Sequence, residues 1–499
     1  MRRTRAAALL LSVALVSCSA GGGDRAEPTT RATTTTRPDR TSTTAPGSTT
    51  TTSAVTTPPA DPAVDDVADT TFPGLGDPRI DVEHYDVTVR AQPGKEPIAG
   101  TVVLTLRPTT AKPLASFTLD LRGPKVTTAT IDGRPATWTA TPTELTVVSP
   151  RPLKPGKRVE VRLEYAGIPD QSEFPEWGIA VGWQADDHHG WFTMSEPNGT
   201  ATWVPVNDHP SDKATWRVSI DVPAKVTAVG NGALSGGAPK HLPDGWWRWT
   251  WSEGEPMASY LALVAIGDYD LVRRSTAGVT SVRAFPPSLS KQQRSGFDPI
   301  EEILAFYSRS FGAYPNEDAG AIVVPTELGV ALETQTRPLF GTDSIEGSWV
   351  SALAHELGHQ WFGDAVSPAT WTDVWLNEGF ATYADWMWED HIGDRSIDDQ
   401  AARTAASLHD MPRSVLDPKS ARDFSEAVYD GGALTLHALR KTVGDATFFR
   451  ILRQWISTYN GTSASTQQFI DLASDVAGKD LGGFFDGWLR HTPQPALPH

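Results

Sequence analysis

The sequence predicts a multidomain α+β protein, in which an antiparallel β domain of sandwich type precedes a mostly helical domain. Three observations predict this fold class. Residues 73–271 contain short segments that alternate apolar and polar residues between Gly/Pro turns. Residues 272–499 contain longer segments with apolar residues at helical spacing. The chain has 499 residues, of which 39% are hydrophobic, so two or three domains can each bury a core.

Residues 1–18 have the pattern of a bacterial lipoprotein signal. An arginine-rich start precedes an apolar run (residues 6–16) that is too short to span a bilayer. The tetrapeptide LVSC resembles the bacterial lipobox, and its Cys18 is the one cysteine of the chain, so no intramolecular disulfide is possible. The resemblance implies cleavage before Cys18 and a lipid anchor on the outer face of the bacterial cell membrane. The alternative is a plain secretory signal with an incidental cysteine.

Residues 19–72 form a low-complexity tract that is dominated by Thr, Ser, Pro and Ala. Because it holds few large apolar residues, we expect a disordered linker that tethers the folded part to the anchor. The formal net charge of the chain is −17, and no long basic run occurs beyond the first few residues. This charge argues against a nucleic acid as partner.

The β domain is predicted over residues 73–271 and the helical domain over residues 272–499. The strand-like segments are YDVTVRA, GTVVLTLRP, ASFTLDLRG, ELTVVSP, RVEVRLEYAG, WRVSIDVP and SYLALVAIGDYDLV. The helical domain begins with one β run, GAIVVP, among helical segments. These helical segments are FDPIEEILAFYSRSFG, SWVSALAHELGHQWF, GFATYADWMWEDHIG, SEAVYDGGALTLHALRKTVG and TFFRILRQWISTY.

The segment SALAHELGHQWFGD predicts a metal site. His355 and His359 are four residues apart, so on a helix they share one face, and neutral imidazoles are good zinc ligands. Glu356 could hold a water molecule in the open coordination position and take its proton. Glu378, nineteen residues after His359, begins the next helical segment and could be the third ligand. The alternative is a helix with two surface histidines.

HELGHQWFGD and WLNEGFA resemble the M1 family of zinc aminopeptidases, whose third ligand has this spacing. Three further segments resemble motifs of that family and occur in its order. They are EPNGTATWVPVNDHPSDKATW, LGVALETQTRP and AVYDGGALTLHALR. The resemblance covers residues 78–499. It implies a thermolysin-like catalytic domain that holds one zinc ion per chain and hydrolyses the amino-terminal residue from peptides.

The resemblance also implies roles for single residues. Tyr429 matches the family's catalytic tyrosine, whose hydroxyl stabilises the negative oxygen that forms on the attacked carbonyl. Glu196 and Glu333 match the carboxylates that bind the free amino terminus of the substrate. Two carboxylates on one ammonium would set the register, so that the first peptide bond lies over the metal.

The chain departs from the family pattern in three places. In the motif around Glu333, Val330 replaces a glycine and Thr334 replaces an asparagine, which we expect to reshape the pocket for the first side chain. Gly431 stands where a lysine is usual after the tyrosine. Larger relatives continue into a further β domain and a helical domain. We therefore expect a short form that lacks this C-terminal helical domain and has a more open cleft.

Two other functions remain open. A thermolysin-like endopeptidase would use the same His, His, Glu ligand set, but it would not need Glu196 and Glu333 to bind an ammonium. A non-catalytic surface lipoprotein could retain zinc as a structural or peptide-binding element, but such a site would not require Glu356. The expected partners are peptides with a free amino terminus and, through Cys18, the membrane.

Overall fold

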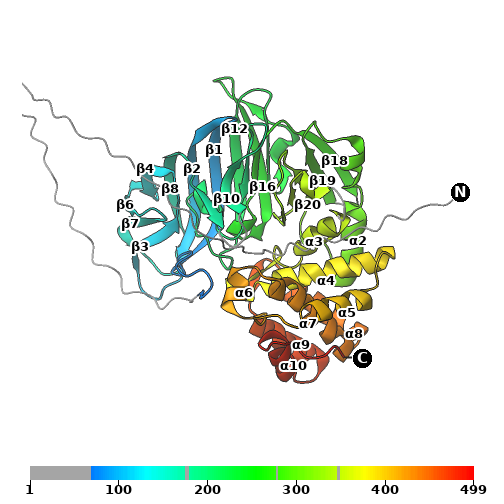
Figure 1. The fold of residues 1–499 in the computed structure, drawn as a ribbon. Coiled ribbons are helices and arrows are strands. Elements are labelled where there is room, and N and C mark those ends of the chain that lie inside the picture. The colour runs from blue at the N-terminus through cyan, green and yellow to red at the C-terminus, as the bar shows by residue number, and fades with distance from the viewer. Residues whose placement is uncertain (1–68, 175–178, 277–278, 346–348, 499) are drawn as a thin grey trace, which may run out of the picture. The chain divides into compact units, whose positions relative to one another are not determined.

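The computed structural model of the chain describes residues 69–174, 179–276, 279–345 and 349–498 (Figure 1). The predicted signal, the predicted lipidation site at Cys18 and nearly all of the predicted linker lie outside the described residues. Everything described below belongs to one contact unit, Ala60–His499. Among the helices described, none combines the length and the apolar character that crossing a membrane requires.

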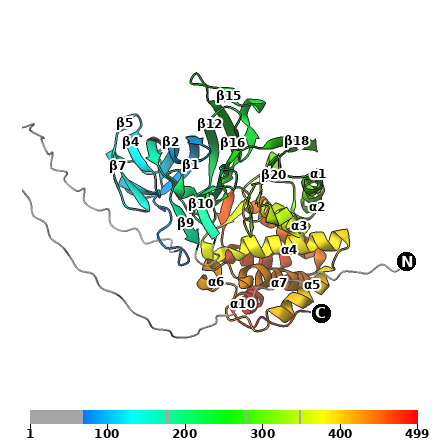
Figure 2. The same ribbon diagram turned by 45° about the horizontal axis from the view of Figure 1, so that its top comes forward.

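The largest sheet has nine strands in the order β14-β16-β12-β1-β2-β8-β4-β5, with β15 paired to β16 (Figures 1 and 2). Its strands are β1 (Ile80–Gln92), β2 (Lys95–Pro108), β4 (Lys125–Ile131), β5 (Arg134–Pro135), β8 (Val159–Gly167), β12 (Ala214–Val222), β14 (Ala233–Leu234), β15 (Lys240–His241) and β16 (Trp247–Met257). Alternate residues such as Val87 and Val89 are fully buried, which confirms the predicted alternation. The expected antiparallel pairing is wrong at one place, because β1 and β12 are parallel. Parallel neighbours need a long crossover, and more than a hundred residues separate these two strands.

Two smaller sheets complete the predicted β domain. A five-stranded sheet has the order β13-β17-β11-β10-β9, and a three-stranded sheet has the order β3-β7-β6. Their strands are β3 (Leu114–Asp120), β6 (Thr137–Ala140), β7 (Glu144–Leu153), β9 (Gln171–Phe174), β10 (Ile179–Ala185), β11 (Trp191–Met194), β13 (Thr227–Gly230) and β17 (Val264–Gly267). The segment SYLALVAIGDYDLV is not one strand. It divides into a 3₁₀ turn η3 (Ser259–Leu261), then β17, then the start of a strand in another sheet.

That other sheet has five strands in the order β18-β19-β20-β22-β21. Its strands are β18 (Asp270–Thr276), β19 (Val279–Phe285), β20 (Asp318–Val323), β21 (Ala331–Leu332) and β22 (Leu339–Phe340). The predicted domain boundary between residues 271 and 272 falls inside β18. The predicted β run GAIVVP is the end of β20, all of whose residues are buried.

Ten helices follow or flank this sheet within the described residues. They are α1 (Lys291–Ser295), α2 (Ile300–Phe311), α3 (Trp349–His359), α4 (Trp375–Ile392), α5 (Ile397–Ser407), α6 (Pro418–Arg422), α7 (Glu426–Val443), α8 (Asp445–Tyr459), α9 (Thr466–Ala477) and α10 (Gly482–Leu489). The strands β23 (Val366–Pro368) and β24 (Thr462–Ala464) pair with each other among the helices. The remaining 3₁₀ turns are η1 (Thr200–Thr202) and η2 (Ser235–Gly237) among the strands of the β domain, and η4 (Asp343–Ile345) and η5 (Trp371–Asp373) near α3 and α4. Helix α4 is buried on all sides over residues 375–388, because α3 and α7 both pack against it (Figure 2). Helices α2, α3, α4, α7 and α8 confirm the predicted helical segments.

Candidate active site

One cavity of about 690 Å3 gathers every predicted site residue except Cys18. Helices α3, α4 and α7 contribute to it, as do the loops that follow β11 and β21. Its lining residues are Glu196, Leu328, Gly329, Val330, Ala331, Glu333, His355, Glu356, His359, Glu378, Phe424 and Tyr429. The cavity therefore combines a cluster of carboxylates and imidazoles with an apolar wall.

The two histidines of α3 face Glu378, which lies in the first turn of α4. The Nε2 atoms of His355 and His359 are 3.1 Å apart, and Glu378 Oε2 lies 3.4 Å and 3.3 Å from them. Four-coordinate zinc binds its ligands at about 2.0–2.1 Å, so tetrahedral ligand atoms stand about 3.3–3.4 Å apart. The three side chains therefore fit one zinc ion.

The surroundings of this triad suit a cation. His359 Nδ1 lies 3.1 Å from the carbonyl oxygen of Phe362 and donates to it, which leaves Nε2 as the ligand atom. Burial alone would lower the pKa of His359, but the charges of Glu378 and Glu333 raise it to about 10. Burial alone would raise the pKa of Glu378, but the charge of His359 and hydrogen bonds from both histidines lower it to about 2. The field that holds a proton on His359 would equally favour a metal ion.

Glu356 lies between the two histidines on α3 and lines the same cavity. Its side chain is buried, and it is not one of the three groups whose ligand atoms converge. Burial raises the pKa of Glu356 well above its usual range, and the charges of Glu333 and Glu378 add to this effect. Glu356 is thus a carboxyl group with a high affinity for protons beside the candidate metal site.

Glu196 and Glu333 come from different parts of the chain and meet beside Glu378. One carboxylate oxygen from each of the three lies within 4.8 Å of the others. Glu196 and Glu333 are buried, and the Oε1 atom of each has no hydrogen-bond partner among the described residues. Burial raises the pKa of Glu333 to about 7, and burial together with the charge of Glu333 raises that of Glu196 well above its usual range. A cation bound between Glu196 and Glu333 would compensate the cost of burying both carboxylates.

Tyr429 lies in the first turn of α7 and faces the imidazole of His355. The two ring centroids are 6.1 Å apart, with an interplanar angle of 23°. Burial raises the pKa of the Tyr429 phenol well above its usual range, and the charges of Glu378 and Glu196 add to the shift. The hydroxyl therefore stays protonated and can donate a hydrogen bond into the cavity.

The apolar wall contains one residue that the sequence did not single out. Phe424 lines the cavity with Val330, and its ring packs at 5.9 Å from Trp371. Phe424 has a φ of 43°, which turns the chain between α6 and α7. No periodic pattern marks this loop, so only the three-dimensional structure identifies the residue.

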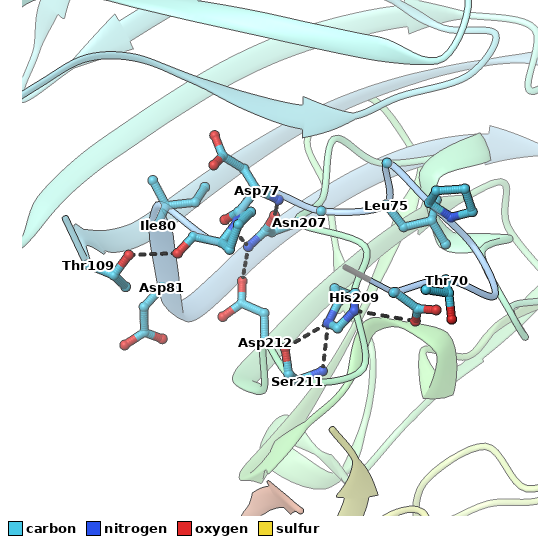
Figure 3. Close-up of a pocket in the computed structure, with 15 residues that line it drawn as sticks. Thr70, Leu75, Asp77, Ile80, Asp81, Thr109, Asn207, His209, Ser211 and Asp212 are labelled. Atoms are coloured by element: carbon cyan, nitrogen blue, oxygen red, sulfur yellow. Dashed lines mark hydrogen bonds and ion pairs between the residues drawn. The ribbon is translucent and has the colours of Figure 1, made fainter. Parts of the chain in front are cut away.

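A second cavity, of about 530 Å3, shares no lining residue with the first (Figure 3). The chain before β1 lines it together with Asn207, His209 and Asp212. Asp212 accepts hydrogen bonds from Asn207 Nδ2 at 2.5 Å and from Val82 N at 3.1 Å. Burial raises the pKa of Asp212 to about 8 despite these bonds. None of the predicted site residues contributes to this cavity.

Comparison with known proteins identifies relatives of both halves. Residues 81–261 match the Peptidase M1 N-terminal domain, and residues 317–488 match the Peptidase family M1 domain. A probable aminopeptidase 2 of Sulfurisphaera tokodaii is 24% identical over 66% of this chain and 45% of its own length. The glutamyl aminopeptidase of Sus scrofa is 23% identical over 84% of this chain and 48% of its own length. The chain thus spans about half the length of these relatives, or less.

Solved structures match over their whole length. A mutant M1 zinc metallopeptidase of Deinococcus radiodurans, crystallised with a Tyr-Ser-Ala substrate, is 33% identical. The match covers 86% of this chain and 99% of that chain, with a TM-score of 0.80. A mutant two-domain M1 zinc metallopeptidase with bound L-tryptophan is 32% identical over 86% of this chain and 99% of that chain, with a TM-score of 0.79.

Proposed function

The chain belongs to peptidase family M1, and from this membership we propose that it is a zinc-dependent aminopeptidase that removes the amino-terminal residue from peptides. One observation carries the proposal. The cavity that contains the His355, His359 and Glu378 triad also contains two buried carboxylates with unsatisfied oxygen atoms, Glu196 and Glu333. An endopeptidase would have no use for this second pair.

We propose that His355, His359 and Glu378 hold one zinc ion. The mutual distances of their ligand atoms, the tautomer of His359 and the ionised state of Glu378 support this assignment. When bound, zinc lowers the pKa of a coordinated water molecule towards about 7 and polarises a substrate carbonyl.

Glu356 is the proposed general base. Its carboxylate would accept a proton from the attacking water molecule and pass it to the leaving nitrogen. Tyr429 is the proposed donor to the carbonyl oxygen, which gains negative charge as the water attacks. Two observations support this role of Tyr429: its ring faces the imidazole of His355, and its raised pKa keeps the hydroxyl protonated. Donation to a charged oxygen is stronger than donation to the ground-state carbonyl, so Tyr429 would favour the transition state.

Glu196 and Glu333 are the proposed binding site for the substrate ammonium. Two carboxylates on one ammonium orient the substrate, so that its first peptide bond reaches Glu356 and Tyr429. The ammonium would also satisfy the two carboxylate oxygens that have no partner among the described residues. The apolar residues Val330 and Phe424 would then border the first side chain.

Hydrolysis of a panel of aminoacyl chromogenic amides tests this proposal. The enzyme should release chromophore from amides with a free amino group, should lose this activity to a chelator, and should regain it with zinc. The amino-acetylated amides are the matched control and should resist hydrolysis. Cleavage of acetylated substrates at comparable rates would support an endopeptidase instead.

We also propose that the protein is a lipoprotein on the outer face of the bacterial cell membrane. The LVSC tetrapeptide with Cys18 supports this localisation, as does the linker-like composition of residues 19–72. Cys18→Ser should move the protein from the membrane fraction to the soluble fraction of the producing cells. Membrane association that survives the substitution would exclude the lipid anchor.

A further inference from the structure

Gln360 connects the metal-ligand helix to the turn that carries Glu333. It directly follows His359 at the end of α3 and is fully buried. Its Nε2 donates to the carbonyl oxygen of Glu333 at 3.2 Å, and its Oε1 accepts from Thr336 N at 2.7 Å. Both ends of one side-chain amide therefore bind the same four-residue turn.

The opposite side of this turn is bound by the N-terminal half of the chain. Asn231 Nδ2 donates to the carbonyl oxygen of Gln335 at 2.8 Å, and Gly232 N donates to Thr336 Oγ1 at 2.8 Å. Thr336 has a φ of 67°, an unfavourable value for a β-branched residue, which persists because these bonds determine the conformation. Gln360 is the member of this network that directly follows α3.

We infer that Gln360 is a positioning residue that sets the spacing between the metal ligands and the carboxylate of Glu333. The inference rests on the proposed function, because that spacing is the distance from a substrate's ammonium to its first peptide bond. Gln360 directly follows His359, the last residue of the helix that also carries His355 and Glu356, so its amide moves with the catalytic groups. Two hydrogen bonds from one planar amide fix both the position and the orientation of the turn.

Burial makes this connection hard to replace. Water does not reach the Gln360 side chain, so an apolar substitute would leave Thr336 N, a buried donor, without its partner. The turn would shift to satisfy that donor and would carry Glu333 with it. Weakened contact with the substrate ammonium follows, whereas Glu356 and Tyr429 keep their places on α3 and α7.

The test compares Gln360→Met with Gln400→Met, both in the zinc-loaded enzyme. Gln400 is also a buried glutamine, and its Nε2 donates to the carbonyl oxygen of Trp386 at 3.2 Å, but Trp386 is not part of the turn that carries Glu333. Gln400→Met therefore reports the general effect of losing a buried amide. Two competitive inhibitors serve as probes: an amino acid amide, and the same amide without its amino group.

For Gln360→Met we expect a rise of about 10-fold or more in the inhibition constant of the amino acid amide, since a hydrogen bond between two charged groups is stronger than a neutral one. The inhibition constant of the deaminated amide and kcat should both stay within about 3-fold of their values in the unmodified enzyme. KM should rise together with the inhibition constant of the amino acid amide. Zinc content should stay at one ion per chain. Gln400→Met should change neither inhibition constant.

Equal weakening of both inhibitors, or unchanged binding of the amino acid amide, would overturn the inference. If Gln360→Met does not fold, Gln360→Glu is measured by the same criterion, because its carboxylate still accepts from Thr336 N and loses only the donor to Glu333. Failure of the proposed function has a different signature. In that case the unmodified enzyme would itself bind the two inhibitors equally.

Discussion

Gly379 of α4 and Gly432 of α7 are in direct backbone contact. A Cβ atom on Gly379 would lie 2.7 Å from the Cα atom of Gly432, and a Cβ atom on Gly432 would lie 2.8 Å from the Cα atom of Gly379. Gly379 directly follows Glu378, and Gly432 lies one turn after Tyr429. This contact therefore sets how closely the α7 tyrosine approaches the candidate metal site.

Gly432→Ala should destabilise the protein, although alanine is favoured in helices by about 1 kcal/mol. Overpacking of this kind costs about 1–3 kcal/mol in the free energy of unfolding, and separation of α4 from α7 should also lower kcat. Chemical denaturation and steady-state kinetics measure both effects. Gly483→Ala in α10 is the control and should be neutral or stabilising, because its added Cβ would have no described atom within 4 Å apart from its chain neighbours and the backbone of its own helix. Equal stability of the two variants would contradict the role of the contact.

Glu356→Gln should retain zinc and lose nearly all hydrolysis. The amide cannot take a proton from water, and general-base catalysis contributes about 10²–10⁴-fold to the rate. Metal analysis of the purified variant, together with kcat on the best chromogenic amide, checks both statements. A rate near that of the unmodified enzyme would remove Glu356 from the mechanism. Loss of zinc would instead make it part of the metal site.

Tyr429→Phe should lower kcat by about 10²–10³-fold, which is the cost of one lost donor to a developing oxyanion. Ground-state binding of an amino acid amide should be nearly unchanged, because Tyr429 is proposed to act on the oxygen that becomes charged only in the transition state. Inhibition constants and kcat, measured on the same preparation, separate the two effects. The reverse pattern, weaker binding with kcat retained, would reassign Tyr429 to substrate binding.

Much of the fold, and the placement of His355 beside His359, could be predicted from the sequence because these signals are local, whereas Glu378 was suggested by its spacing and by the family resemblance. Helices α3 and α4 carry regular apolar spacing, and the positions of His355 and His359 on one face follow from helix geometry alone. Helices α5 and α9 escaped prediction, although Ser465 and Gln468 form a capping box at the start of α9. The parallel pairing of β1 with β12 was not predictable, since strand alternation does not encode which strand lies alongside.

The convergence of Glu196 with Glu333 could not be derived from local pattern. These residues follow strands of two different sheets, and only resemblance to a family suggested that they act together. Gln360 and Asn231 were missed for the same reason, since their partners are backbone groups that are distant in sequence. A hydrogen bond to a main-chain atom does not require a particular partner residue, so the sequence does not reveal it. The proposed roles of all these residues stay predictions.

Asp212→Asn should make the stability less sensitive to alkaline pH. Burial raises the pKa of Asp212 in the folded protein from 3.8 to about 8, so folding favours its protonated form. That contribution is complete below the unfolded pKa and is lost as the pH rises through about 8, whereas asparagine cannot ionise. The melting temperature of the variant relative to the unmodified protein should therefore be higher at ~pH 9 than at ~pH 5. If the melting temperatures of the variant and the unmodified protein differ by the same amount at both pH values, the raised pKa of Asp212 is contradicted.

Anomalous scattering from crystals at the zinc absorption edge tests the proposed metal site most directly. One peak should lie within about 2.0–2.2 Å of Nε2 of His355, Nε2 of His359 and the carboxylate of Glu378. Crystals of Glu378→Ala, grown under the same conditions, should lose the peak or show it much weakened. A peak elsewhere, a fourth side chain bound to the ion, or a Glu378 carboxylate turned away from both imidazoles would contradict the proposed catalytic site.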